Sequence, residues 1–93
     1  MNIEELVPLT NGLSVTTEQT TLVCERARLT PVAKDAIDMA FWIAGTDFAP
    51  RLRLTRQRVL SSTPEQLAAV VRRVARSAVA HVDVRSRPRR RLP

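Results

Sequence analysis

Residues 28–45 read RLTPVAKDAIDMAFWIAG, and this stretch decides the fold that the sequence predicts. Thr30 is a favourable helix N-cap, and Pro31 has the backbone angle that suits the first helical position. Between Pro31 and a stop at Gly45, apolar side chains recur at helical spacing, at Ala33, Ala36, Ile37, Ala40, Phe41 and Ala44. The pattern predicts one amphipathic helix that ends at Gly45.

The chain before this helix has the composition of extended structure. Residues 13–29 are rich in Thr and Val, which favours two short strands. Because successive strand residues point to opposite faces, one face of the second strand is expected to carry Cys24, Arg26 and Arg28. Residues 1–12 end on a turn signal and are expected to form a flexible lead-in.

A second helix start lies at residues 63–66, which read TPEQ. This stretch combines an N-cap, a first-position proline and a glutamine that can close a capping box. An apolar stripe follows at Leu67, Val70, Val71, Val74 and Ala78. We therefore expect a helix that runs from Pro64 to about Ala80.

Residues 51–60 fit two structures, and the sequence leaves the choice open. With Asp47 as N-cap, Pro50 falls in the first turn of a helix, where its missing N–H does little harm. As a strand, Arg51 to Thr55 alternates cleanly and Pro50 marks its start.

The chain has 93 residues, which corresponds to one domain, and we place that domain at residues 13–84. Residues 85–93 are rich in arginine and proline, so a disordered basic tail is expected there. Cys24 is the only cysteine, which suits a reducing cytoplasm. No apolar run approaches the roughly 20 residues that span a bilayer, and no membrane association is expected.

Charge is divided unevenly along the chain. Residues 1–47 carry three basic and seven acidic side chains, whereas residues 48–93 carry twelve arginines and two acidic side chains; the total is +6. A half as basic as the second one attracts a polyanion or an acidic protein surface.

Catalysis is not expected from this composition. His81 is the only histidine, and two glycines cannot build a phosphate-binding loop. A single cysteine cannot form a thiolate metal site. The sequence therefore predicts a protein that is no enzyme and holds neither metal nor cofactor.

The residues expected to bind nucleic acid are arginines from two separate segments: Arg26, Arg28, Arg51, Arg53, Arg56 and Arg58. Phosphate neutralisation needs several such groups on one surface. No aromatic residue is interleaved with them in the sequence, which disfavours base stacking and favours duplex DNA as the ligand.

The stretch from Arg28 to Gly45, with its Arg-Leu-Thr-Pro entry followed by Ala33-Lys34, Ile37 and Ala40, resembles ribbon-helix-helix antitoxins of the kind paired with acetyltransferase toxins. The helix start at Pro64 is similar to the segment that leads into the toxin-binding tail of that family.

This resemblance implies a homodimer that is mostly α with a short N-terminal β region, in which paired strands place Arg26 and Arg28 in the major groove of DNA. It also implies that the C-terminal helix holds a toxin through Leu67, Val70, Val71, Val74, Arg72, Arg73 and Arg76. The function expected is that of a small DNA-binding regulator or antitoxin.

The alternative is a small α+β protein in which a sheet packs on two helices. Its arginine-rich surface would meet an acidic protein surface, as in a phage-encoded inhibitor, an adaptor or an assembly subunit.

Overall fold

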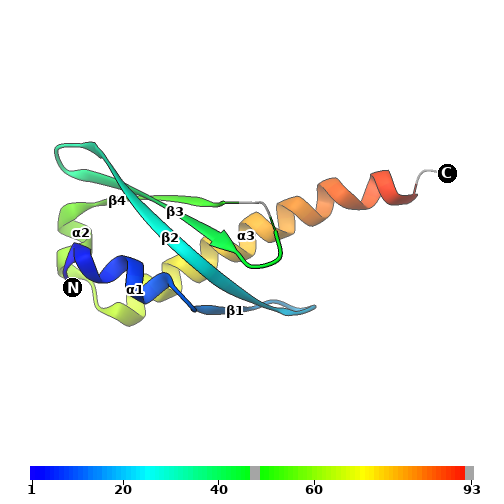
Figure 1. Ribbon diagram of the computed structural model, residues 1–93, viewed down its shortest axis with the longest axis horizontal. Coiled ribbons are helices and arrows are strands. Elements are labelled where there is room, and N and C mark those ends of the chain that lie inside the picture. Colours follow the sequence, from blue (N-terminus) through cyan, green and yellow to red (C-terminus); the bar gives the residue numbers. More distant parts are fainter. Residues whose placement is uncertain (47–48, 92–93) are drawn as a thin grey trace.

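A computed structural model describes residues 1–46 and 49–91, with side chains described as far as Ala80. The chain is α+β: a curled antiparallel sheet of four strands, in the order β1-β2-β3-β4, is combined with helices before and after it (Figure 1). The elements are η1 (Ile3–Glu5), α1 (Leu6–Thr10), β1 (Ser14–Thr16), β2 (Thr21–Ala33), β3 (Ala36–Ile43), β4 (Arg51–Thr55), α2 (Arg56–Ser61) and α3 (Pro64–Arg91).

The expected mostly α, ribbon-helix-helix-like fold is wrong, because residues 28–45 form most of a β-hairpin instead of a helix. In β3, inward side chains alternate with outward ones, and the inward set is buried: Ile37, Met39, Phe41 and Ile43. This period of two, together with β-branched and aromatic residues, favours a strand. The alanines in this stretch recur at helical spacing by coincidence, and their spacing does not reflect the structure.

A β-bulge between Cys24 and Arg26 changes which residues of β2 share a face. Cys24 is fully buried on the inner face, whereas Arg26 and Arg28 are exposed on the outer face. The expectation that Cys24 lies beside these arginines is therefore wrong. A bulge adds one residue to a strand and so reverses the alternation that follows it.

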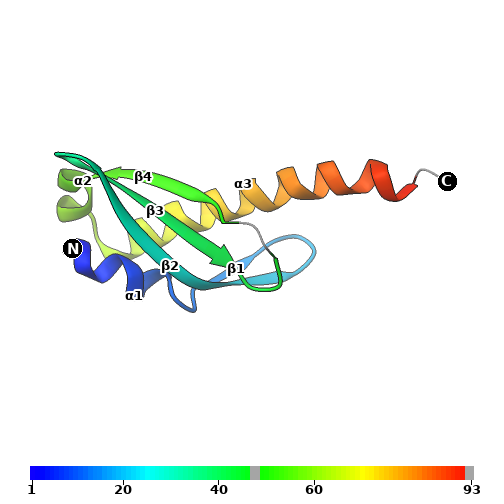
Figure 2. The ribbon, with the colours of Figure 1, turned by 45° about the horizontal axis from the view of Figure 1, so that its top comes forward.

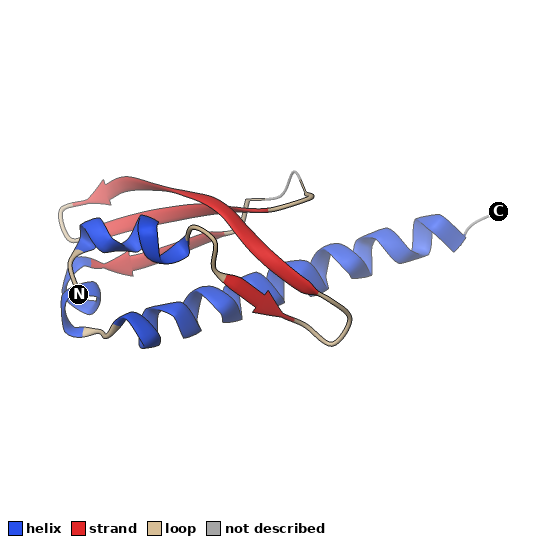
Figure 3. Ribbon diagram, turned by 60° about the horizontal axis from the view of Figure 1, so that its bottom comes forward, coloured by secondary structure: helices blue, strands red, loops and turns tan. Residues whose placement is uncertain are grey.

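The hydrophobic core lies between the inner face of the sheet and the helices. Leu6 of α1, Val59 of α2 and Leu67 of α3 are buried against the inward residues of β3. Figure 2 shows α1 and α2 together at the end of the molecule where the chain begins. Figure 3 shows α3 running alongside the sheet and continuing beyond it. The helices thus cover one face of the sheet and leave the other open.

The predicted start of α3 is confirmed. The backbone N–H of Gln66 donates to Thr63 Oγ1 at 3.2 Å, and the N–H of Thr63 donates to Gln66 Oε1 at 2.9 Å. The helix does not stop near Ala80 but continues to Arg91. In the segment expected to be a disordered basic tail, residues 85–93, the side chains lie outside the described part of the chain.

Residues 51–60, for which helix and strand were both open, contain one of each. Arg51–Thr55 forms β4 beside β3, and α2 follows directly. Thr55 accepts a hydrogen bond from the N–H of Arg58 at 3.1 Å, which caps α2. At the start of the chain, the residues expected to be a flexible lead-in form η1 and α1, where Leu6 and Thr10 are fully buried.

Candidate nucleic-acid interface

The candidate site is the outer face of the sheet, which the helices leave uncovered. The strand register arranges its side chains in three rows across β2, β3 and β4: Thr30, Asp38 and Arg53; Arg28, Ala40 and Arg51; Arg26 and Trp42. Directly opposed residues on antiparallel strands have Cβ atoms about 5 Å apart, so each row is continuous. Segments far apart in the sequence therefore build one surface.

At one end of this face, Arg26 lies over the indole ring of Trp42. The guanidinium carbon is 4.5 Å from the ring centroid, which is a cation–π contact. Both residues belong to outward positions that pair across β2 and β3. A half-buried tryptophan and an exposed arginine thus form a stacked pair at this end of the face.

At the opposite end, Arg53 forms a two-point ion pair with Asp38. Arg53 Nε donates to Asp38 Oδ1 at 2.8 Å, and Arg53 Nη2 donates to Oδ2 at 3.3 Å. These hydrogen bonds, aided by the charges of Arg53 and Arg51, hold the pKa of the Asp38 carboxyl below its ordinary value. Asp38 is therefore ionised at neutral pH and can act only as a hydrogen-bond acceptor.

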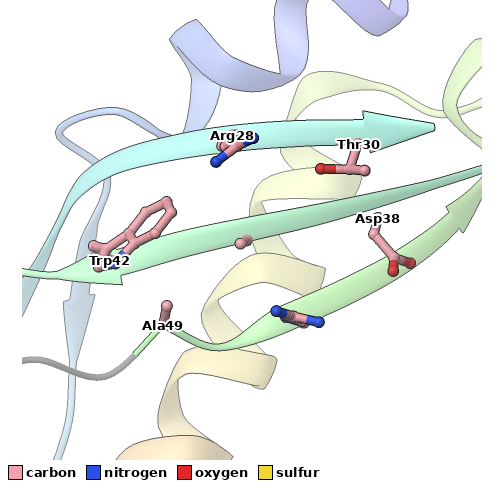
Figure 4. A pocket seen from close by; sticks show the side chains of 7 residues that line it. Arg28, Thr30, Asp38, Trp42 and Ala49 are labelled. Carbon is pink, nitrogen blue, oxygen red and sulfur yellow. The ribbon is translucent and has the colours of Figure 1, made fainter. Parts of the chain in front are cut away.

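Between the two ends, the face is hollowed into a depression of about 350 Å³ (Figure 4). The depression exists because two of its lining residues, Ala40 and Ala49, have side chains of a single methyl group. Larger polar and aromatic side chains surround it: Arg28, Thr30, Asp38, Trp42 and Arg51. Its size is at the lower end of the range of about 300–1,000 Å³ that is usual for small-ligand pockets.

The charge of this face is positive. Four arginines stand on it, and Asp38 is the one acidic residue among the three rows. A surface with several convergent guanidinium groups neutralises phosphate and attracts polyanions over a distance of about 10 Å at ordinary salt. The chemistry that the face can perform is binding, through phosphate contacts and stacking.

The structure brings together four of the six arginines that were expected to bind nucleic acid. Arg26, Arg28, Arg51 and Arg53 share the outer face, whereas Arg56 and Arg58 lie on α2 and are exposed there. Arg58 lines a separate shallow groove between α2 and α3.

The residues expected to hold a partner protein on α3 have three different environments. Leu67 and Val71 are buried in the core of the chain itself, and Val74 packs against that core. Arg72 and Arg76 donate hydrogen bonds to the backbone of β1. Val70 and Arg73 remain, and both line the groove beside Arg58. Most of the predicted set therefore stabilises the fold.

Within the residues that the structure describes, no group of three or more His, Cys, Asp or Glu side chains is placed to hold a metal ion. Burial raises the pKa of the Cys24 thiol, against an opposing effect of Arg72. No described helix is long and apolar enough to cross a membrane.

Trp42 and Asp38 are the residues of this face that the helical interpretation missed. In a helix from Pro31 they share a polar side while Ala40 lies on the opposite, apolar side, but in a strand all three share the outer face. The alternation of residues 36–43, with every second residue strongly apolar, was the signal that could have identified them.

The chain matches no protein-family model, no curated protein and no solved structure. The residues that carry the resemblance to ribbon-helix-helix antitoxins form the β2–β3 hairpin, so the strand-to-helix entry of that family is not present here. The function must be argued from the geometry of the outer face.

Proposed function

We propose that this protein is a non-enzymatic nucleic-acid-binding module, and that the outer face of its sheet binds a single strand. The observation that carries the proposal is the Arg26–Trp42 stack beside the row that contains Arg28 and Arg51. Modules that bind single strands combine a positive surface with aromatic or guanidinium planes on which bases stack.

The geometry favours a single strand over a duplex. Duplex DNA was expected because no aromatic residue is interleaved with the arginines in the sequence, but in the fold Trp42 lies among them. The two-stranded ribbon that was expected to enter a major groove is that of the ribbon-helix-helix fold, which this chain lacks. A regulatory role, in a cytoplasm where the lone Cys24 stays reduced, belongs to the same proposal.

Fluorescence anisotropy with a labelled single-stranded 20-mer of mixed sequence, in DNA and RNA forms, tests this function. We expect binding that weakens as salt rises, because phosphates are neutralised by arginine. Arg28→Ala and Arg51→Ala should each weaken binding by several fold, and Trp42→Leu by about tenfold through lost stacking. Arg56→Ala, an exposed arginine on α2, is the matched control and should bind like the wild type.

Two results would contradict the proposal. One is an affinity that does not depend on salt, and the other is equal binding by Arg28→Ala, Arg56→Ala and the wild type. Preference for the duplex form of the same 20-mer would show that the ligand is instead double-stranded.

A second candidate function is protein binding, and the groove between α2 and α3 is the observation in its favour. Arg58 and Arg73 flank an apolar floor formed by Leu67 and Val70. Leu60 on α2 is 56% exposed, which is high for a large apolar side chain. An acidic amphipathic segment would match the arginines and the apolar residues of this groove, and Leu60 adds an exposed apolar side chain elsewhere on α2.

Affinity capture followed by mass spectrometry separates the two functions. For a partner in the α2–α3 groove, the wild type and Arg28→Ala should both capture it, whereas an Arg58→Glu, Arg73→Glu variant should not. If Arg28→Ala is the variant that fails to capture the partner, the partner binds to the outer face of the sheet instead.

The expected homodimer is kept as a proposal on a different basis. In the described part of the chain, β1 pairs with β2 only from Thr21 to Val23, so the later residues of β2 have β3 on one side and no strand on the other. Such an edge can add a strand from a second copy. Sedimentation velocity over a concentration series would detect that dimer, and a strict monomer would exclude it.

A further inference from the structure

We propose that the depression on the outer face recognises a single nucleobase that carries an exocyclic amino group, in preference to thymine or uracil. This inference rests on the proposed single-strand binding and names the base that the site prefers.

The position of the base follows from the spacing along β3. Alternate residues of a strand lie about 6.7 Å apart, so Ala40 has Trp42 on one side and Asp38 on the other, each about 6.7 Å away. Ala40 is the smallest outward side chain in the middle of the face, and the hollow lies above it. A flat ring over Ala40 therefore has an aromatic neighbour at one edge and a carboxylate at the opposite edge (Figure 4).

The two arginines in the same row as Ala40 can hold the backbone of the bound nucleic acid. Arg28 on β2 and Arg51 on β4 stand on either side of Ala40 in the register. A base centred on Ala40 places its sugar and phosphate within reach of one of these guanidinium groups, which bind phosphate through paired N–H donors. The pocket therefore offers phosphate contacts beside a site for one ring.

Asp38 determines which ring edge is accepted. An ionised carboxylate has about four lone-pair sites, and the two hydrogen bonds from Arg53 occupy two of them. The remaining sites can accept only from a donor such as the amino group of cytosine, adenine or guanine. Thymine and uracil have a carbonyl oxygen in place of the amino group, and their one donor on this edge, N3–H, is flanked by two carbonyl oxygens that a carboxylate repels.

The ion pair also keeps this acceptor in place. Arg53 is 65% exposed whereas the Asp38 side chain is 22% exposed, so the arginine reaches across from β4 and holds the carboxylate against the face. The lowered pKa of Asp38 keeps it charged throughout the physiological range. Asp38 is thus a fixed acceptor at one wall of the hollow.

Equilibrium binding of two pyrimidine 12-mers, dC12 and dT12, at one salt concentration tests the inference. The two ligands have the same length, charge and ring size. They differ in the exocyclic group at C4 (amino or carbonyl), in the proton at N3 and in the C5 methyl group of thymine, so the Asp38 variant below is needed to assign the preference to the carboxylate. We expect the wild type to bind dC12 about tenfold more tightly than dT12, the effect of one hydrogen bond to a charged group.

Three variants identify the cause of that preference. Asp38→Asn should reduce the ratio between dC12 and dT12 to within about twofold, because an amide can face either ligand. Ala40→Val should fill the hollow and lower both the affinity and the ratio. Ala36→Val is the matched control, since Ala36 lies on the same face of β3 but outside the depression, and it should keep the tenfold ratio.

The outcomes separate this inference from the proposed function. Equal binding of dC12 and dT12 by the wild type, or a ratio that Asp38→Asn leaves unchanged, overturns the base preference and leaves single-strand binding intact. Tighter binding of dT12 also overturns it. Failure to bind both 12-mers overturns the base preference, and failure to bind the mixed 20-mer as well removes the proposed function together with this inference.

Discussion

Arg72 of α3 donates a hydrogen bond through Nε to the carbonyl oxygen of Ser14 in β1, at 3.0 Å. Arg76 makes the same contact with the carbonyl oxygen of Thr16, also at 3.0 Å. The spacings match, because four residues of a helix rise about 6 Å and two residues of a strand about 6.7 Å. The two arginines therefore act as a clamp on the outer edge of a three-residue strand.

We expect this clamp to stabilise the N-terminal part of the sheet. Arg72→Ala and Arg76→Ala should each lower the free energy of unfolding by about 1 kcal/mol, as for a typical hydrogen bond. Urea denaturation followed by circular dichroism measures the change. Arg73→Ala is the control, because Arg73 lies between them in sequence but faces the α2–α3 groove. A double clamp variant as stable as Arg73→Ala would show that these contacts add nothing.

The capping box at the start of α3 should contribute measurably to stability. Thr63→Ala removes the acceptor for the N–H of Gln66 and should cost about 1 kcal/mol. Thr63→Ser keeps the hydroxyl group and should remain close to the wild type. A double-mutant cycle with Gln66→Ala tests whether the two reciprocal bonds depend on each other. Additive losses would mean that the two caps act independently.

Residues whose structure depends on near neighbours could be predicted from the sequence. The Thr63–Gln66 box closes within one turn, and both of its hydrogen bonds are local. The strands β1 and β2 were expected from their β-branched residues and are present. In each case the signal and the structure span the same few residues.

The stretch from Thr30 to Gly45 could not be assigned in that way, because its structure depends on pairing with distant segments. β3 pairs with β2 on one side and β4 on the other, and its strand form requires both. Pro31 is typical of a helix start, but it is tolerated in β2 because the described part of the chain places no strand beside it on the side away from β3. Tertiary pairing thus overrides the local helix signal.

The candidate site was only partly predictable for the same reason. The alternation of residues 51–55 in the sequence predicts that Arg51 and Arg53 share one face of a strand. Their position beside Arg28 and Trp42 depends on the register of three strands and on a bulge after Cys24. Neither the register nor the bulge can be predicted from a single sequence. The bulge decides that the arginines of β2 face outward while Cys24 faces the core.

Cys24 should be unreactive in the folded protein. Its side chain is fully buried, and burial raises the pKa of the thiol, so little thiolate is available near neutral pH. We expect slow reaction with a disulfide reagent at pH 8 and rapid reaction of one thiol per chain in denaturant. The unfolded protein is the internal control. Rapid labelling under native conditions would show that β2 opens at the bulge.

The ion pair between Asp38 and Arg53 should make stability depend on pH only on the acid side. The folded-state pKa of Asp38 lies below its ordinary value, mainly through the Arg53 hydrogen bonds, so the stabilisation is fully present above about pH 4. It is lost as the pH falls through the lowered folded-state pKa, since the carboxyl group then takes up a proton. Asp38→Asn has no carboxyl group to titrate at this position.

We therefore expect the urea midpoints of the wild type and Asp38→Asn to differ at pH 7 and to converge as the pH approaches 2. The difference at pH 7 should be small, because Arg53 is largely exposed and surface ion pairs contribute little. Arg53→Gln should reproduce the neutral-pH loss, since it removes the other partner. A gap between wild type and Asp38→Asn that widens on acidification would mean that the charged form of Asp38 destabilises the fold, contrary to the geometry of the pair.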